Sequence, residues 1–393
     1  MVLRILALAF IWVGASLAWI VLGSTLLFRT EHADAAQRTQ LGSLWGPEQS
    51  QAAPTFTYSS LAESRTVAPD ASAITVDLRL DQRRKGLLWY NTYHVDFAGT
   101  YRVRSSGDDR TLELAFKLPA QNAVYDDVSV LIDGKRVPDE LIAGVVTVDV
   151  PVTPHRTTEV AVSYRSQGVG KWSYAFGTGI STVRDFDLTM QTNFQAIDFP
   201  EGTLAPTQER LTPSGWELDW RYRDVVTGYG IGMVFPQPLQ PGPLAQRLTF
   251  WAPLSLLFYF FVLSVIITIQ RIELHPVNFF FLAAAFFSFH LLFAYTVDRV
   301  PIYTAFALCS LVSMFLTVSY LRIVAGLRFA AVEAGVAQFF YLILFSLALF
   351  NEGFSGLAIT IGSIITLFVT MQLTARINWS ERFARRPGQP APL

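Results

Sequence analysis

The chain has 393 residues, of which 51% are hydrophobic and 16% are charged, with a formal net charge of −1 and one cysteine. This composition is too apolar for an ordinary soluble enzyme, and the lack of a basic excess excludes a nucleic-acid binder. A single cysteine also excludes a disulfide framework and a thiolate metal cluster. Residues 30–247 hold 46 of the 61 charged side chains and residues 248–375 hold eight, so a water-soluble and a lipid-soluble segment share the chain.

Several apolar runs are long enough to cross a membrane, whose hydrocarbon core about 30 Å thick requires roughly 20 helical residues. The first run is Ile5–Phe28, with no charge between Arg4 and Arg29. Five more runs follow, at Leu248–Gln270, Val277–Val297, Pro301–Leu321, Ala334–Phe350 and Phe354–Ala375. We predict an α-helical bundle of six spans, one N-terminal and about five C-terminal. Five spans is the alternative, because Glu333 can hold the fifth run at the interface.

The N-terminal segment 1–30 is interpreted as an uncleaved anchor. Its apolar run of 24 residues exceeds the usual length in a signal peptide, although Ala33-Asp34-Ala35 leaves cleavage as the alternative. Most arginines near span ends fall on one side, namely Arg4, Arg271, Arg322, Arg328, Arg376, Arg382, Arg385 and Arg386. The positive-inside rule then places both termini in the cytoplasm and residues 30–247 outside. Residues 376–393 become a basic cytoplasmic tail.

The external segment is predicted to be mainly β-structure. Residues 31–73 are interpreted as a membrane-proximal helix and then a loop, with a helix breaker at Leu44-Trp45-Gly46-Pro47. Period-two alternation follows in six stretches, whose apolar members are Ile74/Val76/Leu78/Leu80, Leu112/Leu114/Phe116/Leu118, Val146/Val148/Val150, Val160/Val162/Tyr164, Phe186/Leu188/Met190 and Trp216/Leu218/Trp220/Tyr222. Such one-sided alternation favours antiparallel strands, so we expect residues 74–247 to form an all-β, sandwich-like domain. Turns are expected at Ser106–Asp109 and at Asp133-Gly134.

The sequence contains no motif of a zinc protease, a phosphate-binding loop, a nucleophile elbow or a dinucleotide fold. Gly177-Thr178-Gly179 is glycine-rich, but no helix follows it, so we interpret it as a turn. We therefore predict no catalytic residue, no cofactor and no metal site. The chain is expected not to be an enzyme.

The densest aromatic run, Trp89–Phe97, supplies the external candidates for an interaction site. As a strand it places Trp89 and Tyr93 on one face, and His94 and Asp96 on the other with Tyr90 and Thr92. His94 and Asp96 could contribute to a metal or acid–base site, whereas a solvated strand face is the commoner meaning of this pattern. A site needs convergent groups that one strand cannot supply.

Four polar residues of the membrane segment are candidates because polar groups there are costly and often functional. His290 lies within the third run, His275 and Asn278 lie at its start, and Gln338 enters the fifth run. No span centre contains Asp, Glu, Lys or Arg, the residues that commonly mark a transport path. We therefore favour hydrogen bonds between helices over transport for these side chains.

The chain resembles the inner-membrane CreD family of bacteria. The local matches are Leu44-Trp45-Gly46-Pro47, Gly86-Leu87-Leu88-Trp89-Tyr90, Tyr93 with Val95-Asp96-Phe97, Gly99-Thr100-Tyr101, Asn193-Phe194 with Asp198-Phe199, Glu273-Leu274-His275-Pro276, and Arg376-Ile377-Asn378-Trp379. The resemblance implies a multi-pass protein of the bacterial inner membrane with a role in cell-envelope integrity, often expressed under a two-component system. It implies no enzymatic activity, cofactor or catalytic residue.

Three functions remain open. The first is a non-enzymatic envelope protein whose external domain contacts periplasmic or cell-wall partners. The second is a transporter or channel for a small solute or ion, lined by His290, Gln338 and Asn278. The third is a signal relay to a two-component histidine kinase through the tail 376–393. The lipid bilayer is the partner common to all three, and no nucleic acid is expected.

Overall fold

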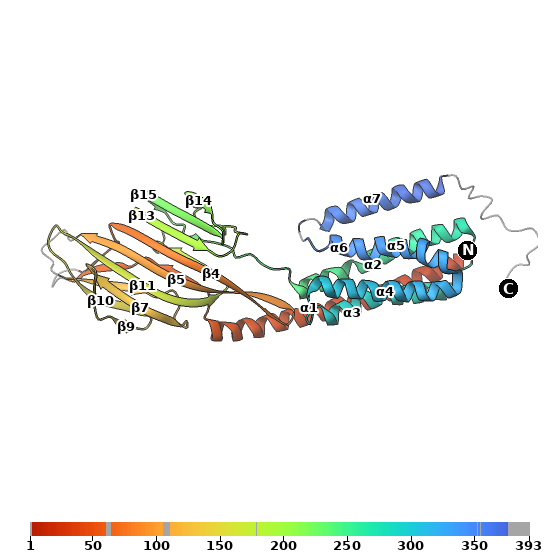
Figure 1. Cartoon of the computed structure of the whole chain (residues 1–393), viewed down its shortest axis with the longest axis horizontal. Coiled ribbons are helices and arrows are strands. Elements are labelled where there is room, and N and C mark those ends of the chain that lie inside the picture. The colour runs from red at the N-terminus through yellow and green to blue at the C-terminus, as the bar shows by residue number, and fades with distance from the viewer. Residues whose placement is uncertain are drawn as a thin grey trace, which may run out of the picture. The chain divides into compact units, whose positions relative to one another are not determined.

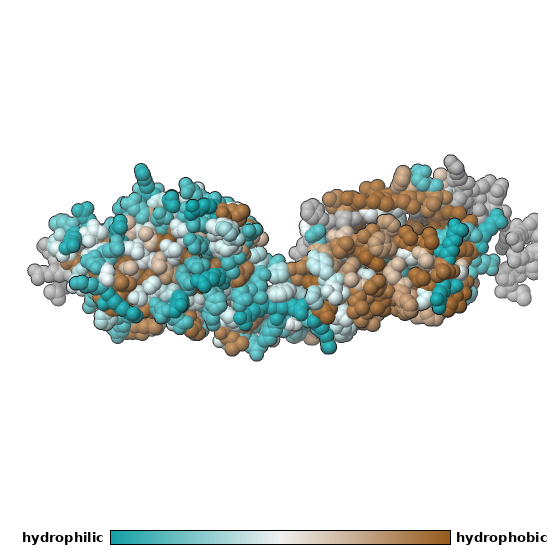
Figure 2. All heavy atoms as spheres, in the orientation of Figure 1, coloured by the Kyte–Doolittle hydropathy of each residue, from teal (hydrophilic) through white to brown (hydrophobic). Residues whose placement is uncertain are grey.

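The chain divides into a helical unit and a β unit. The computed structural model describes residues 2–59, 64–104, 111–177, 179–351, 353 and 355–375. The helical unit consists of Met1–Ala33, Gly86–Leu88 and Leu239–Leu393, and the β unit consists of Asp34–Lys85 and Trp89–Pro238. Figure 2 shows mostly apolar surface over the helices and mostly polar surface over the strands. The last and longest segment of the helical unit begins at residue 239, nine residues before the predicted start of the C-terminal span region at residue 248.

Helix α1 (Val2–Trp45) contributes to both units (Figure 1). Its first part contains the predicted anchor, and its last part, Asp34–Trp45, belongs to the β unit. The helix ends where Gly46 adopts a positive φ of 91° and donates its N–H to the Gly42 carbonyl at 3.0 Å. Glycine adopts this conformation without steric cost, and Pro47 follows it, so this segment is a helix breaker as predicted.

The helices that follow α1 complete the helical unit. They are α2 (Pro241–Gln270), α3 (Pro276–Thr296), α4 (Ile302–Ala325), the π-helix η1 (Phe329–Ala334), α5 (Gly335–Gln338), the π-helix η2 (Phe339–Leu344), α6 (Phe345–Ala348) and α7 (Ser355–Thr374). Within the described residues, five helical stretches are long and apolar enough to span a membrane, including one near the N-terminus and one over Phe329–Ala348. Within α7, the stretch Ile359–Thr374 is a shorter apolar helix.

Proline sets the starts of α2 and α3. Pro241 and Pro276 occupy first-turn positions, where a missing N–H costs nothing and the fixed φ favours a helix. Helix α2 thus begins seven residues before the predicted span and includes Arg247, whose guanidinium donates to the Leu349 carbonyl at 3.1 Å. The helices enclose one apolar core that includes Trp19, Leu256 and Phe286.

The β unit contains three sheets. The first has eight strands in the order β14 (Gln208–Leu211), β15 (Trp216–Thr227), β13 (Ser181–Thr192), β4 (Ala71–Lys85), β5 (Leu88–Arg104), β11 (Thr157–Val169), β7 (Tyr125–Ile132) and β8 (Lys135–Arg136). The second has five strands in the order β3 (Ser64–Val67), β2 (Thr55–Ser59), β6 (Thr111–Lys117), β10 (Val145–Pro151) and β9 (Glu140–Ile142). The third consists of β1 (Gln49–Ala52), β12 (Trp172–Ala175) and β16 (Ile231–Gly232).

The predicted alternation is confirmed, because the apolar members of the six stretches are buried or partly buried in one core that all three sheets share. The Asp133-Gly134 hairpin is confirmed as well, since both residues have positive φ and connect β7 to β8. The expected turn at Ser106–Asp109 lies outside the described residues, as does Thr178 of the glycine-rich turn.

Two expectations about the β unit were wrong. The sheets are not wholly antiparallel, since β13 runs parallel to β4, with Phe186 opposite Ser72 and Thr192 opposite Leu78. A strand added beside a distant strand through a crossover, rather than through a hairpin, can run parallel to it. The segment 46–73 is also not a loop, because it contains β1, β2 and β3.

Strand β1 was missed because its buried side chains are polar. Gln49 and Gln51 are both buried. The Gln49 amide donates to Ser166 Oγ at 2.8 Å, and the Gln51 amide oxygen accepts from the Tyr164 hydroxyl at 2.9 Å. These hydrogen bonds offset the cost of removing the amides from water. A hydrophobic pattern cannot reveal such a strand.

Candidate functional site

His94 and Asp96 do not share a partner. His94 is exposed, and its ring meets the edge of Trp45 at a centroid distance of 5.4 Å. Asp96 accepts a hydrogen bond from the Arg79 guanidinium at 2.5 Å, and Arg79 also contacts Asp77 at 3.0 Å. Among the described residues, no group of three or more His, Cys, Asp or Glu side chains could hold a metal ion. The two residues therefore form no acid–base pair with each other.

Trp89 and Tyr93 differ in burial although they were predicted on one face. Tyr93 is fully buried, its hydroxyl donates to the Lys171 carbonyl at 2.8 Å, and burial raises the pKa of the hydroxyl well above its ordinary value. Trp89 is partly buried, with the Arg84 guanidinium 6.0 Å from its ring centroid. Tyr90 and Thr92, expected in solvent, are buried. Tyr90 is buried because it contacts the part of α1 that belongs to the β unit, where Asp34 accepts a hydrogen bond from the Tyr90 hydroxyl at 3.2 Å.

Two membrane candidates stabilise the start of α3. The His275 side chain caps the helix by accepting from the Val277 N–H at 3.3 Å. Asn278 Oδ1 accepts from the Tyr320 hydroxyl of α4 at 2.8 Å. Both side chains thus have local structural roles at one end of the helix.

Gln338 belongs to a hydrogen-bonded chain between three helices. Its amide donates to Ser313 Oγ of α4 at 2.9 Å, and Ser313 donates to the Ala285 carbonyl of α3 at 2.6 Å. Gln338 is fully buried, and among the described residues its Oε1 has no partner. It lies between η1 and η2, and Ser255 donates to the Tyr341 carbonyl within η2. Such inserted hydroxyls satisfy carbonyls where the helix is locally widened.

His290 lies elsewhere in the helical unit. Its Nδ1 is 3.2 Å from the Phe286 carbonyl of the same helix, and its ring meets Trp19 of α1 edge-on at 5.7 Å. The side chain is 2% exposed. The partners of His290, Gln338 and Asn278 are therefore separate, and none of the contacts described links the three into a path.

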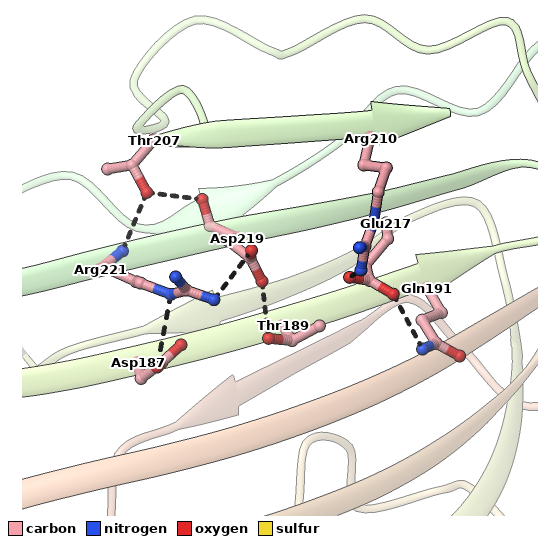
Figure 3. A network of polar contacts seen from close by, with 8 residues as sticks. All are labelled: Asp187, Thr189, Gln191, Thr207, Arg210, Glu217, Asp219 and Arg221. Carbon is pink, nitrogen blue, oxygen red and sulfur yellow. Dashed lines mark hydrogen bonds and ion pairs between the residues drawn. The ribbon is translucent and has the colours of Figure 1, made fainter. Parts of the chain in front are cut away.

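Figure 3 shows a polar network that the sequence did not reveal, on β13, β14 and β15. Asp219 accepts from the Thr189 hydroxyl at 2.7 Å and from the Arg221 guanidinium at 3.0 Å. Arg221 also lies 3.5 Å from Asp187, and Glu217 accepts from Arg210 and from Gln191. Because all of these contacts except that between Arg221 and Asp219 cross between neighbouring strands, they fix the register at this end of the sheet.

A cleft of about 860 Å³ lies where two sheets end, beside the terminal strands β8 and β9. Its apolar lining comes from Ile132, Val137, Pro138, Val148 and Pro151. Its polar lining contains five carboxylates, from Glu113, Asp133, Asp139, Glu140 and Asp149, against a single Lys135. We call this feature the edge cleft. The sequence did not predict it, because its walls come from segments spread between residues 113 and 151 that only the sheet pairing brings together.

Comparison with known proteins identifies the family of this chain. The family model described as "Inner membrane protein CreD" matches residues 46–380. No curated protein matches the chain. One solved structure is of a protein from Legionella pneumophila described as nutrient-binding. The similarity covers 54% of the present chain and 75% of the Legionella chain, with 9% sequence identity and a TM-score of 0.30. An M1 zinc metallopeptidase from Deinococcus radiodurans is similar over 42% of each chain, with 15% identity and a TM-score of 0.25. Scores this low carry no argument about function.

Proposed function

The chain belongs to the CreD family of inner membrane proteins, and from this premise we propose that it is a non-enzymatic envelope protein. In this role the helices anchor the chain in the bilayer, and the β unit contacts a periplasmic or wall-associated partner. The contact supports the integrity of the cell envelope. The five apolar helices found in the described part of the chain and the family membership agree with a location in the inner membrane.

The edge cleft is the observation that carries this proposal. It combines apolar walls, which favour burial of a ligand, with five carboxylates that disfavour an anionic one. It also lies next to β9, whose Leu141 and Ile142 are exposed and which has one neighbouring strand. An unpaired strand edge can accept a further strand through its backbone. We therefore infer that the partner presents basic groups on an extended segment.

The proposed topology places the β unit on the outer side. It rests on the distribution of arginines, which favours a cytoplasmic location for both termini. An envelope partner then meets the β unit directly. Labelling of single cysteines introduced at Asp139 and at Arg271 in a chain that carries C309S, with a membrane-impermeant thiol reagent on intact spheroplasts, tests this. Labelling only at residue 139 is expected, and labelling only at residue 271 would reverse the topology.

Anchoring accounts for the helical unit more simply than transport. Several charged side chains there contact groups at helix ends, with Arg4 donating to the Leu274 carbonyl at 2.8 Å and Arg29 lying 3.8 Å from Asp298. Glu333 accepts from Gln270 at 3.1 Å. Charges so placed orient helices and do not line a conducting path. The signal-relay alternative depends on the tail 376–393, which lies outside the described residues.

Charge reversal in the edge cleft tests the proposed function. A strain lacking the gene is complemented with the wild type, with a double variant D139K/E140K, or with a control D224K/E209K that reverses two exposed carboxylates elsewhere in the β unit. Envelope integrity is scored by sensitivity to detergent and by leakage of a periplasmic enzyme. We expect the cleft variant to lose complementation at unchanged membrane abundance, and the control to retain it. Full complementation by both would refute a role for the cleft.

A photo-crosslinker at Val137 then identifies the partner. Val137 is partly buried in the cleft wall, and Asp224 provides an exposed control position. A crosslinked envelope component at residue 137, absent at residue 224 and lost in D139K/E140K, supports the proposal. Equal crosslinking at both positions contradicts it.

A further inference from the structure

A second hollow, independent of the proposed function, lies in the helical unit between α1 and α3. This groove has a volume of about 460 Å³ and is lined by five residues of α1 between Leu17 and Thr25 and by Phe287, Leu291 and Tyr295 of α3. Figure 1 labels both helices within the helical unit. Phe287 of the lining also meets the buried Trp19 of α1 edge-on, with ring centroids 5.5 Å apart.

The groove is apolar and open on its outer side. The Thr25 hydroxyl in its lining donates to the Val21 carbonyl of its own helix at 2.8 Å, so this hydroxyl proton is already bonded. Val21 is 66% exposed and Leu291 is 41% exposed, although both lie within apolar helices of membrane-spanning length. In a bilayer these surfaces meet hydrocarbon, and an open apolar groove of this kind takes an acyl chain rather than water.

One end of the groove is cationic. Arg29 lies one helical turn beyond Thr25, and its guanidinium carbon is 5.1 Å from the centroid of the Tyr295 ring. Arg299, which is exposed, follows Tyr295 by four residues. The Asp298 carboxylate lies 3.8 Å from the Arg29 guanidinium, which is longer than a charge-assisted hydrogen bond. The Arg29 side chain thus remains 34% exposed at this end.

We propose that the groove binds one acyl chain of an anionic phospholipid whose phosphate is held by Arg29. Arginine binds phosphate through parallel N–H donors, and the cationic end accounts for a preference for an anionic head group. The apolar lining accounts for the chain. Charge complementarity favours an anionic lipid over the apolar transmembrane helix of a partner, which would bring no further anion to the exposed part of Arg29.

Such a lipid would also hold α1 against the other helices. The contacts that join α1 to them include two long-range hydrogen bonds, from Arg4 to the Leu274 carbonyl and from Trp12 Nε1 to the Pro253 carbonyl, both at 2.8 Å. The packing of Trp19 on α3 adds to these. An acyl chain in the groove would fill the remaining space between α1 and α3, so loss of the lipid should loosen α1.

Native mass spectrometry of the full chain, released from phosphatidylcholine nanodiscs that contain a minor fraction of phosphatidylglycerol, tests the proposal. We expect one retained phosphatidylglycerol. L291W fills the groove and should abolish retention, whereas L311W, at an exposed position of α4, should not. R29Q should weaken the preference for phosphatidylglycerol about fivefold, which is the effect of one arginine at an anionic surface. R322Q, at an exposed position near the end of α4, serves as its control.

The outcomes separate the alternatives. Equal lipid retention in L291W and L311W overturns the proposal, and so does retention of phosphatidylcholine with no preference for the anionic lipid. A co-purifying protein in place of a lipid, displaced by L291W, overturns it in favour of a helix partner. Because L291W could fail to fold, L17W fills the same groove from α1, and circular dichroism of each variant confirms its helical content.

Discussion

The guanidinium carbon of Arg83 lies 4.0 Å from the centroid of the Trp45 ring, which joins the last residue of α1 to strand β4. The same indole meets His94 of β5 edge-on, so a single side chain connects the helix end with two neighbouring strands. Arg83 is held in place by Asp81 at 2.9 Å. The Leu44-Trp45-Gly46-Pro47 segment, which the sequence singled out as a helix breaker, is therefore also a packing element of the β unit.

Replacing Trp45 should destabilise the β unit. W45A removes the cation–π contact and the edge contact, and we expect a loss of about 1 kcal/mol in the free energy of unfolding. W45F keeps an aromatic ring and should lose less. Thermal unfolding of the full chain in detergent, followed by near-ultraviolet circular dichroism, measures the difference. A stability of W45A equal to that of the wild type would show that the indole contacts contribute nothing.

Asp219 should matter more than other acidic residues of β15. Its side chain is 12% exposed and accepts from Thr189 and Arg221, so D219A leaves the Thr189 hydroxyl without this acceptor and removes one of the two carboxylates beside Arg221. We expect a loss of about 2 kcal/mol. D224A, at an exposed position on the same strand, should change stability by less than about 0.5 kcal/mol. Chemical denaturation measures the free energy of unfolding of both variants. Equal losses would mean that the network does not stabilise the β unit more than an exposed carboxylate does.

The Gln338–Ser313 hydrogen bond can be measured by a double-mutant cycle. Q338L and S313A are compared singly and together in bicelles by steric-trap unfolding. We expect a coupling free energy of about 0.6 kcal/mol, the average for hydrogen bonds between membrane helices. A coupling near zero would mean that the two side chains do not interact in the bilayer. H290L combined with S313A is the control pair, and its effects should be additive because the two residues have separate partners.

Gly242 should not tolerate a side chain. A Cβ at this position would lie 2.6 Å from Thr30 Oγ1 and 3.1 Å from the Cβ of Leu87, while the Gly242 N–H donates to the Leu87 carbonyl at 2.9 Å. We expect G242A to destabilise the helical unit by about 1–3 kcal/mol through overpacking. G14A is the matched control, since nothing lies within 4 Å of its Cβ, and alanine favours a helix. The temperature of thermal aggregation in detergent compares the stability of G242A with that of G14A.

The β unit should lose stability at alkaline pH. Burial raises the pKa of Tyr101 and Tyr164 well above the ordinary value and raises the pKa of Tyr125 to about 12. Above about pH 10 the unfolded chain loses these protons while the folded chain keeps them. Stability is therefore fully present below about pH 10 and falls as the pH rises through the folded pKa values. Y125F should make this fall less steep, and an unchanged slope would contradict the assignment.

Structural features that depend on residues close together in the chain could be predicted from the sequence. Alternation of apolar residues identified Ile74–Leu80 and Leu112–Leu118 as strand faces, because side chains two apart share one face of a strand. Apolar length identified the membrane helices in the same way, and Asp133-Gly134 identified a hairpin. Strand β1 was not predicted because its buried side chains are glutamines. Hydrogen bonds with the hydroxyls of Ser166 and Tyr164 offset the cost of burying them.

Candidate residues were harder to assign, since their roles depend on partners far along the chain. His94, Asp96, His290, Gln338 and Asn278 were all recognised as polar residues in unusual places. Which groups they contact, among them Trp45, Arg79, Trp19, Ser313 and Tyr320, could not be read from spacing. The edge cleft and the groove between α1 and α3 were not foreseen at all.

The sequence by itself determined the division into a charged β-rich segment and an apolar helical segment, because hydropathy and periodicity act locally. It also determined the family resemblance that the comparison confirmed over residues 46–380. Only the tertiary structure decided that β13 lies parallel to β4, that carboxylates between residues 113 and 149 converge on one cleft, and that Arg29 stands at the end of an apolar groove. These features arise from contacts between residues distant in sequence, whose free energy depends on packing geometry that no local pattern encodes.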